Sequence, residues 1–258
     1  MQHGICINTL VPMRKTADHR SEMVSQILFG ELYEVFEERK NWLYIRCDYD
    51  QYEGWISRNE FFALEPDQHA KLKAAPGTTV WQTLVHLKEI ESGRSIHVVA
   101  GSTLYHCAGN LCSMPGKTFK VTGLKEKPAF PDVRTEIQEI ARQYLSSPYL
   151  WGGRSPFGLD CSGFTQVVFK IAGKTIPRDA SQQVTWGETI HFLNDALPGD
   201  LAFLQNEEGN VTHTGIILPD SKIIHSSGSV RIDQLDHQGI YNEDAHHYTH
   251  ALRTVKRI

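Results

Sequence analysis

The feature that most constrains the fold is the order of two hydrophobic periodicities along the chain. A strand-like period of two comes first, and a helix-like spacing of three and four residues follows. In "WLYIRC", Leu43, Ile45 and Cys47 alternate with the residues between them, which is the period of two expected for a half-buried strand. Turn-forming segments such as "EERKN" and "DYDQYEG" separate the short runs of this first part of the chain. Short strands at such spacing predict a small β-barrel. The composition shifts at "EKPAFPD", which we interpret as a linker.

Helical spacing follows this linker. One helix is predicted around residues 137–145 and a second over residues 161–171, because apolar residues recur there three and four positions apart. Asp160 is a good cap for the second helix, and Gly173 stands where that helix should end. Four strand-like runs come next: "GDLAFL", "HTGIIL", "SKIIHSS" and "THALRTVKRI". Helices followed by antiparallel strands predict an α+β domain.

Cys161 lies in the first turn of the second predicted helix, after a Gly-rich run that allows a sharp turn. The unpaired N–H groups and partial positive charge of a helix start favour an anion, so this thiol should ionise more readily than a free cysteine. A thiolate is a nucleophile. A free cysteine is nevertheless most often a small core residue, and the position alone leaves both interpretations open.

Two of the thirteen histidines are candidates for a base beside that thiol. His213 in "VTHTGIIL" and His225 in "KIIHSSG" each lie at the edge of a short apolar run, and a turn containing Pro219 and Asp220 joins the runs. If the runs pair as a hairpin, both rings can reach one face near the start of the cysteine helix. Histidines in strands are more often structural than catalytic, so spacing alone does not decide this point.

Charge and composition exclude some classes of function. A net charge of −4 gives no overall attraction to nucleic acid or to an anionic membrane, and we expect neither as a partner. No segment approaches the ~18 apolar residues of a membrane span. The N-terminal residues lack the features of an export signal. We therefore expect a cytoplasmic protein.

The five cysteines are an odd number spread thinly over the chain, which favours a reduced interior over a disulfide scaffold. Cys107 and Cys112 beside His106 form only a weak candidate for a zinc site, and ordinary strand and turn residues are the favoured interpretation. For "HHYTH" at residues 246–250, a solvated terminal segment is similarly favoured over a metal site. We expect no metal and no cofactor.

The first part of the chain resembles a known small domain. The arrangement "VPMR … FGELYEVFEERKNWLYIRC … EGWIS" is similar to a bacterial SH3 domain, which we place at residues 1–68. Residues 73–125 contain similar short runs, "SIHVVAG", "TLYHC" and "TFKVTG", and are interpreted as a second SH3-like barrel.

Residues 130–258 resemble the NlpC-type cell-wall cysteine peptidases, which have a small papain-like fold. Six blocks carry the resemblance in order: "YLWGG", "LDCSGFTQ", "PRDASQQ", "PGDLAF", "THTGI" and "IIHSSG". It implies that Cys161 is the nucleophile, His213 the base and His225 the residue that holds the His213 tautomer. The expected architecture is thus multidomain, with two small all-β SH3-like barrels before an α+β papain-like peptidase domain.

Among these peptidases, the combination with SH3-like barrels most resembles the γ-D-glutamyl-L-diamino acid endopeptidases. They cut peptidoglycan stem peptides after L-Ala-γ-D-Glu, need a free amino end on the alanine, and serve cell-wall recycling. The resemblance implies that Asp179 and Ser162 bind the substrate ammonium, that Tyr149 and Trp151 line the site, and that Tyr52 closes its far end. Asp160 is also expected among the substrate contacts.

Structural roles remain open for these residues. The aromatic residues could be packing residues, Asp179 a helix cap and Ser162 merely a first-turn residue, and Tyr49 lies close enough to Tyr52 to replace it. Other functions also remain open. They are a general wall hydrolase, an amidase or acyltransferase on the same frame, and a wall-binding module with an idle catalytic domain.

Overall fold

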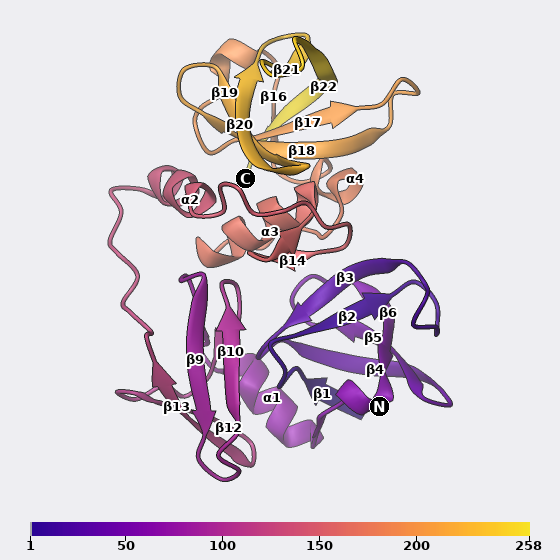
Figure 1. Cartoon of the computed structure of the whole chain (residues 1–258), viewed down its shortest axis with the longest axis vertical. Helices are drawn as coiled ribbons and strands as arrows, with labels where there is room; N and C mark the ends of the chain where they lie inside the picture. Colours follow the sequence, from indigo (N-terminus) through magenta and orange to yellow (C-terminus); the bar gives the residue numbers. More distant parts are fainter. Residues whose placement is uncertain (1) are drawn as a thin grey trace. The chain divides into compact units, whose positions relative to one another are not determined.

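The computed structural model of the chain describes residues 2–258. The chain forms two compact units, one up to Lys127 and the other from Pro128 onward (Figure 1).

The first unit contains a seven-stranded antiparallel sheet with the order β3-β2-β6-β5-β4-β1-β7. Its strands are β1 (Gln2–Ile5), β2 (Leu10–Arg14), β3 (Met23–Leu28), β4 (Leu32–Arg39), β5 (Trp42–Cys47), β6 (Glu53–Ser57) and β7 (Ala63–Leu64). In β5 the expected alternation is confirmed, because Leu43, Ile45 and Cys47 are buried and the residues between them are half-buried. This sheet is the SH3-like barrel.

Four further strands form a second sheet, with the order β10-β9-β13-β12. They are β9 (Leu84–Glu89), β10 (Ser95–Val99), β12 (Leu111–Met114) and β13 (Lys117–Thr122), and β8 (Thr78–Thr79) pairs with β11 (Thr103–Leu104) beside them. This part shares a core with the barrel: the rings of Phe29 and Phe119 meet edge to face at 5.5 Å, and Tyr105 Oη donates to the Gly30 carbonyl at 3.0 Å. A second independent SH3 barrel is therefore not confirmed.

Two short helices follow β6 in this unit. A 3₁₀ turn spans Arg58–Glu60, and α1 spans Pro66–Ala74. The sequence pattern does not predict α1, because only His69 and Leu72 of this helix are buried and the apolar periodicity is weak. Local signals start it instead, since Pro66 occupies the first helical position behind the cap residue Glu65.

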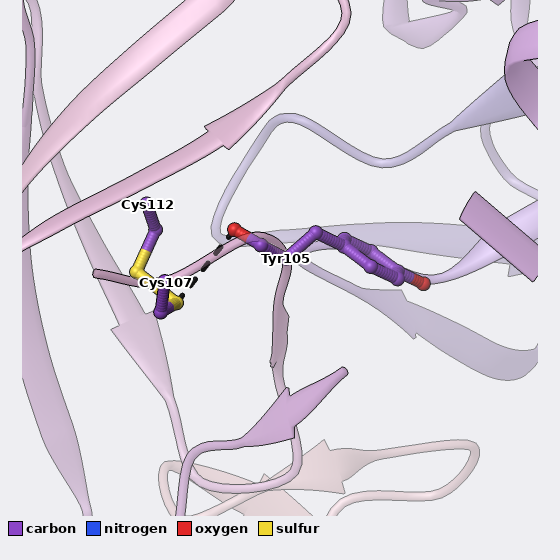
Figure 2. Close-up of a disulfide and its surroundings, with 3 residues drawn as sticks. All are labelled: Tyr105, Cys107 and Cys112. Carbon is purple, nitrogen blue, oxygen red and sulfur yellow. Dashed lines mark hydrogen bonds between the residues drawn. A yellow bond between two sulfur atoms is a disulfide. The ribbon is translucent and has the colours of Figure 1, made fainter. Parts of the chain in front are cut away.

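Cys107 and Cys112 are joined by a disulfide, so the expectation that all five cysteines are reduced is wrong for this pair (Figure 2). Figure 2 also shows the Sγ atom of Cys107 directed toward the carbonyl of Tyr105, 3.7 Å away. The β-bridge between Ala108 and Leu111 brings the two cysteines close together. Because both sulfurs are in the disulfide, they are not zinc ligands.

In the second unit, helices precede an antiparallel sheet, as expected (Figure 1). The helices are α2 (Val133–Arg142), α3 (Cys161–Ile171) and α4 (Ala180–Gln183), with the short pair β14 (Arg154–Ser155) and β15 (Gly158–Leu159) before α3. Every residue of α3 is buried, and the Phe164 ring meets Tyr144, just beyond α2, at 5.9 Å. Helix α3 therefore lies in the interior of this unit and fixes the position of its first residue, Cys161.

The sheet of this unit has the order β16-β22-β17-β18-β19-β20-β21, and β22 also pairs with β21. Its strands are β16 (Glu188–Ile190), β17 (Leu201–Gln205), β18 (Val211–Leu218), β19 (Lys222–Ser227), β20 (Ser229–Leu235), β21 (Gly239–Asn242) and β22 (His247–Arg257), and a 3₁₀ turn covers Leu193–Asp195. The double pairing of β22 joins both ends of a six-strand run, so that β17 to β22 close on themselves. Apolar side chains from these strands fill the interior.

Candidate active site

The start of α3 is held by the carboxylate of Asp160. One oxygen, Oδ1, accepts the Gly163 N–H at 2.7 Å, and the other, Oδ2, accepts the Gly152 N–H at 2.8 Å. A Cβ atom at Gly163 would lie 2.2 Å from the Gly153 carbonyl oxygen, so only glycine fits there. The glycines around Cys161 therefore allow the preceding loop to pack directly on the helix start.

The expected hairpin is confirmed, and it brings the two histidines together. Strands β18 and β19 pair with Gly215 opposite His225, and His213 lies two residues before Gly215 on the same face. The rings meet edge to face, with His213 Nε2 2.8 Å from His225 Nδ1. A Cβ atom at Gly215 would lie 2.8 Å from the Cβ of His225, so this glycine makes room for the second histidine.

The sulfur of Cys161 lies against the backbone of β18, at the two residues on either side of His213. Its Sγ atom is 3.9 Å from the carbonyl oxygen of Thr212, and the backbone of Thr214 also acts on the thiol. These two residues flank His213. Because Nε2 of His213 is engaged by His225, Nδ1 is the ring nitrogen that remains for the thiol.

Burial controls the charge of both groups. Burial, with the negative charge of Asp160 acting in the same direction, raises the pKa of Cys161 to about 12. Burial, together with His225 and His250, holds the pKa of His213 well below its usual value. The expected easy ionisation of the thiol is therefore wrong for the resting site, because burial outweighs the helix start. Both pKa shifts favour a neutral thiol and a neutral imidazole over the charged forms.

Two residues that sequence reasoning did not place in the site, Asp233 and His250, contact these histidines, and a third, Arg231, holds Asp233. Asp233 accepts from His225 Nε2 at 2.9 Å, and Arg231 grips the same carboxylate with two hydrogen bonds. His250 stacks on His213 with ring centroids 4.2 Å apart, so its assignment to a solvated terminal segment is wrong. Arg231 and Asp233 lie two residues apart, so the sequence alone indicates that they share one face of a strand. Only the strand pairing shows that this face contacts His225.

A second buried network lies beneath the start of α3. Arg178 donates from Nη1 to Asp160 Oδ1 at 2.9 Å and from Nη2 to Asp160 Oδ2 at 2.7 Å, and Nη1 also donates to Ser162 Oγ at 3.0 Å. Both carboxylate oxygens of Asp160 thus have partners within the unit, which makes this residue a support of the helix start. Its expected contact with substrate stays a prediction, as does that of Ser162.

Tyr149 lines a cavity together with His213 and His250, and its expected contact with substrate stays a prediction. A cavity of about 270 Å³ is bounded by seven residues: Tyr149, Thr212, His213, Ser226, Ser227, Gly228 and His250. Burial raises the pKa of Tyr149 to about 12, and the nearby Cys161 acts in the same direction. The phenol therefore stays protonated and can donate a hydrogen bond.

The other three expected contacts lie on three separate segments of the chain. Asp179 is half-buried and forms a capping box with Gln182 at the start of α4, so its role as a helix cap is confirmed. Trp151 is 59% exposed, which excludes packing in the core for this indole. Tyr52 belongs to the first unit, in the turn between β5 and β6, where it packs at the edge of the barrel core. The substrate roles of these three residues stay predictions.

Over residues 2–258, the structure has no helix that is both long and apolar enough to cross a membrane. The same residues include no group of three or more histidines, cysteines or acidic residues that could hold a metal ion.

A thiol on the first turn of a buried helix, next to a histidine that a second polar residue orients from an antiparallel sheet, defines a cysteine peptidase of papain-like fold. The model of the NlpC/P60 family matches residues 146–251, and the model of the bacterial dipeptidyl-peptidase SH3 domain matches residues 13–61. The chain belongs to the NlpC/P60 family.

Curated relatives match over most of the chain. The γ-D-glutamyl-L-lysine dipeptidyl-peptidase of Bacillus subtilis is 30% identical over 220 residues, which cover 78% of this chain and 71% of that protein. Dipeptidyl-peptidase 6 of Lysinibacillus sphaericus is 27% identical over 267 aligned positions, which cover 94% of this chain and 95% of that protein.

Among solved structures, an NlpC/P60 family protein from Bacillus cereus matches with a TM-score of 0.82 and 20% identity, covering 100% of this chain and 99% of the other. At that identity the match concerns the fold, which extends over both units.

Proposed function

We propose that this cysteine peptidase hydrolyses the bond between γ-D-Glu and the L-diamino acid in peptidoglycan stem peptides that have a free N-terminal L-Ala. The observation that carries the proposal is the cluster of Cys161, His213 and His225 in a chain that also has the bacterial dipeptidyl-peptidase SH3 domain. The names of the B. subtilis and L. sphaericus relatives support the bond and the dipeptide product.

The arrangement supports a mechanism in two steps. His213 takes the thiol proton at Nδ1 as Sγ of Cys161 attacks the γ-carbonyl carbon, and the backbone N–H of Cys161 donates to the oxyanion that forms. Protonated His213 then gives its proton to the departing amine of the diamino acid, which leaves a thioester. Water, deprotonated by His213, hydrolyses that thioester and regenerates the thiol. His225 holds the His213 ring throughout.

The free amino end of the substrate needs an acceptor. We assign it to the carboxylate of Asp179, with Ser162 beside it, because Asp179 directly follows the buried Arg178 and is only half-buried. Tyr149 and Trp151 line the cleft next to the thiol, and Tyr52 closes the alanine end.

The test compares L-Ala-γ-D-Glu-L-Lys with its N-acetylated form, using the wild type and Asp179→Ala. Acetylation removes the ammonium and with it the charge-assisted hydrogen bond to this carboxylate, so kcat/KM of the wild type should fall by at least about tenfold to a hundredfold. The variant should cut the free peptide poorly and discriminate less between the two peptides. Equal cleavage of acetylated peptide, or of intact cross-linked wall, by the wild type contradicts the proposal and favours a general wall hydrolase.

The place of action is part of the proposal. Substrates with a free alanine end are released fragments, so we propose that the enzyme works in cell-wall recycling in the cytoplasm. The Cys107–Cys112 disulfide argues in the other direction, since disulfides persist mainly in oxidising compartments. Cell fractionation with alkylation of free thiols before lysis decides: a cytoplasmic protein with both thiols reduced supports the proposal, and an exported, oxidised protein contradicts it.

For the first unit we propose that residues 73–125 are a second SH3-like barrel whose core has merged with that of the first. The four-stranded sheet and the β8–β11 pair support this interpretation.

A further inference from the structure

A buried chain of polar groups continues past His225. Its next member is the carboxylate of Asp233, which is 5% exposed and lies with Oδ2 2.9 Å from His225 Nε2. Arg231 Nε donates to Oδ2 at 2.7 Å, and Nη2 donates to Oδ1 at 2.8 Å. The same guanidinium reaches the exposed Asp244 at 2.9 Å. Three groups in line, an imidazole, a carboxylate and a guanidinium, thus stand behind His213.

The charge of Asp233 follows from these contacts. Burial acts to raise its pKa, but the hydrogen bonds from His225 and Arg231 outweigh burial and hold the pKa below its usual value. Arg231 is permanently cationic and binds both oxygens in a planar two-point geometry. Asp233 is therefore a carboxylate near neutral pH, and a carboxylate can only accept hydrogen bonds.

The charge of Asp233 fixes the position of the proton first on His225 and then on His213. Because Asp233 only accepts, neutral His225 must have its proton on Nε2, which leaves Nδ1 bare. Bare Nδ1 can only accept, so the proton between the two rings belongs to His213 Nε2. Neutral His213 then has a bare Nδ1, the nitrogen left for the thiol of Cys161. The opposite tautomer of His225 would place the bare Nε2 against the Asp233 carboxylate, with one lone pair facing another.

We propose that Asp233, clamped by Arg231, is a positioning residue that sets the proton arrangement of both histidines and so keeps His213 ready to accept the thiol proton. Asp233 contacts neither the thiol nor the scissile bond in this arrangement. It acts through His225. The kinetic part of the proposal rests on the proposed peptidase function, whereas the proton arrangement itself does not.

The charged and titratable groups around His225 come from three strands and one loop. Asp233 and Arg231 lie on β20, His213 lies on β18, and His250 on β22 has its ring centroid 6.0 Å from that of His225. Asp244 faces only the outer side of Arg231. Among these, Asp233 is the negative group in direct contact with His225.

The first test reads the tautomers without any substrate. Nitrogen-15 NMR of histidine-labelled protein, assigned with His213→Asn and His225→Asn, should show wild-type His213 and His225 both protonated on Nε2. Asp233→Asn should redistribute the proton of His225 between its nitrogens, because an amide can present either a donor or an acceptor. Asp236→Asn is the matched control: this aspartate directly follows the same strand, accepts from Tyr248 and should leave the spectrum unchanged. A wild-type His225 protonated on Nδ1 overturns the proposal without any variant.

The second test is kinetic and uses the L-Ala-γ-D-Glu-L-Lys peptide. Asp233→Asn should lower kcat by about tenfold to a hundredfold with KM within about twofold, since the altered group does not touch substrate. The same change in a His225→Asn background should cost little, because asparagine has no tautomer to set. An equal loss in both backgrounds overturns the positioning role. If the peptide is not cut at all while the tautomers respond to Asp233→Asn, the proposed function fails and the proton arrangement stands.

Discussion

At Cys161 two effects on the thiol oppose one another. The helix start favours the thiolate, whereas burial and the adjacent carboxylate of Asp160 favour the thiol and raise its pKa to about 12. His213 allows the thiol to react despite its raised pKa, because burial also favours the neutral imidazole, which can accept the thiol proton. Reactivity then depends on the pair and not on the cysteine alone.

We predict that Cys161 reacts with iodoacetamide at neutral pH faster than Cys6 or Cys47, which are buried in the core of the first unit. His213→Ala should slow that reaction by at least about tenfold, because the thiol loses the base that takes its proton. Mass spectrometry of peptides after timed alkylation measures both rates. Cys161→Ala should remain folded and hydrolyse no peptide. A Cys161 rate equal to that of the core cysteines argues against the nucleophile role.

Among the elements, the β18–β19 hairpin is the most sensitive to a small change. Its register places Gly215 directly opposite His225, where an added methyl group would meet both His225 and Ile223 at 2.8 Å. Neither neighbour can move far, since both are buried in the sheet.

Gly215→Ala should therefore lower the free energy of unfolding by about 1–3 kcal/mol, the range for overpacked cores, and abolish most activity by displacing His225. Urea unfolding and kcat measured on the same preparation test the two effects. Full activity in a stable variant would show that the hairpin tolerates a wider separation than its register suggests.

A second element-scale feature is the carboxylate of Asp200, which joins three segments. It accepts from Arg134 of α2 at 2.8 Å, from Arg257 of β22 at 2.9 Å and from the Leu197 N–H at 2.9 Å. Although burial acts to raise the pKa of this carboxyl, these hydrogen bonds hold it below the usual value.

Stability should therefore depend on pH in a definite direction. A carboxyl whose pKa is lowered by folding stabilises the fold above its unfolded pKa, about 3.9, and this contribution is lost as the pH falls through the folded value. Urea midpoints should fall on acidification below about pH 5. Asp200→Asn should be less stable at pH 7 and lose less on acidification. A parallel decline of both proteins would assign the acid sensitivity to other groups.

At the scale of the whole molecule, each unit has its own core, and the complete histidine cluster lies within Pro128–Ile258. We predict that residues 128–258 produced alone unfold cooperatively and keep rapid alkylation of Cys161. The proposed role of Tyr52 predicts that they lose at least about tenfold in kcat/KM for the free-amine peptide.

In the full chain, Tyr52→Ala should reproduce that kinetic loss, and Tyr49→Ala serves as the matched control from the same turn. Unchanged kcat/KM in the isolated second unit would mean that the first unit does not shape the substrate site. A large effect of Tyr49→Ala alone would move the assignment to that residue.

The sequence by itself determined the features that depend on near neighbours. Apolar spacing and the cap residue Asp160 predict α3 and place Cys161 at its start, and the short turn between two apolar runs predicts that His213 and His225 share a face. The ordered motifs then connect these residues to a peptidase family. Such signals are local, because helix caps, hairpins and periodicity act over a few residues.

Only the tertiary structure decided which distant residues complete the site. Asp233 and His250 reach the histidines through the pairing of β19 with β20 and the closure of the sheet by β22, and Arg178 reaches Asp160 from the segment before α4. The shared core of the first unit was missed for the same reason. The disulfide joins cysteines only five residues apart, and it was missed because the odd number of cysteines favoured a reduced chain. The charge of Cys161 was also decided there, because burial depends on all the atoms packed around the thiol, and that packing outweighs the local effect of a helix start.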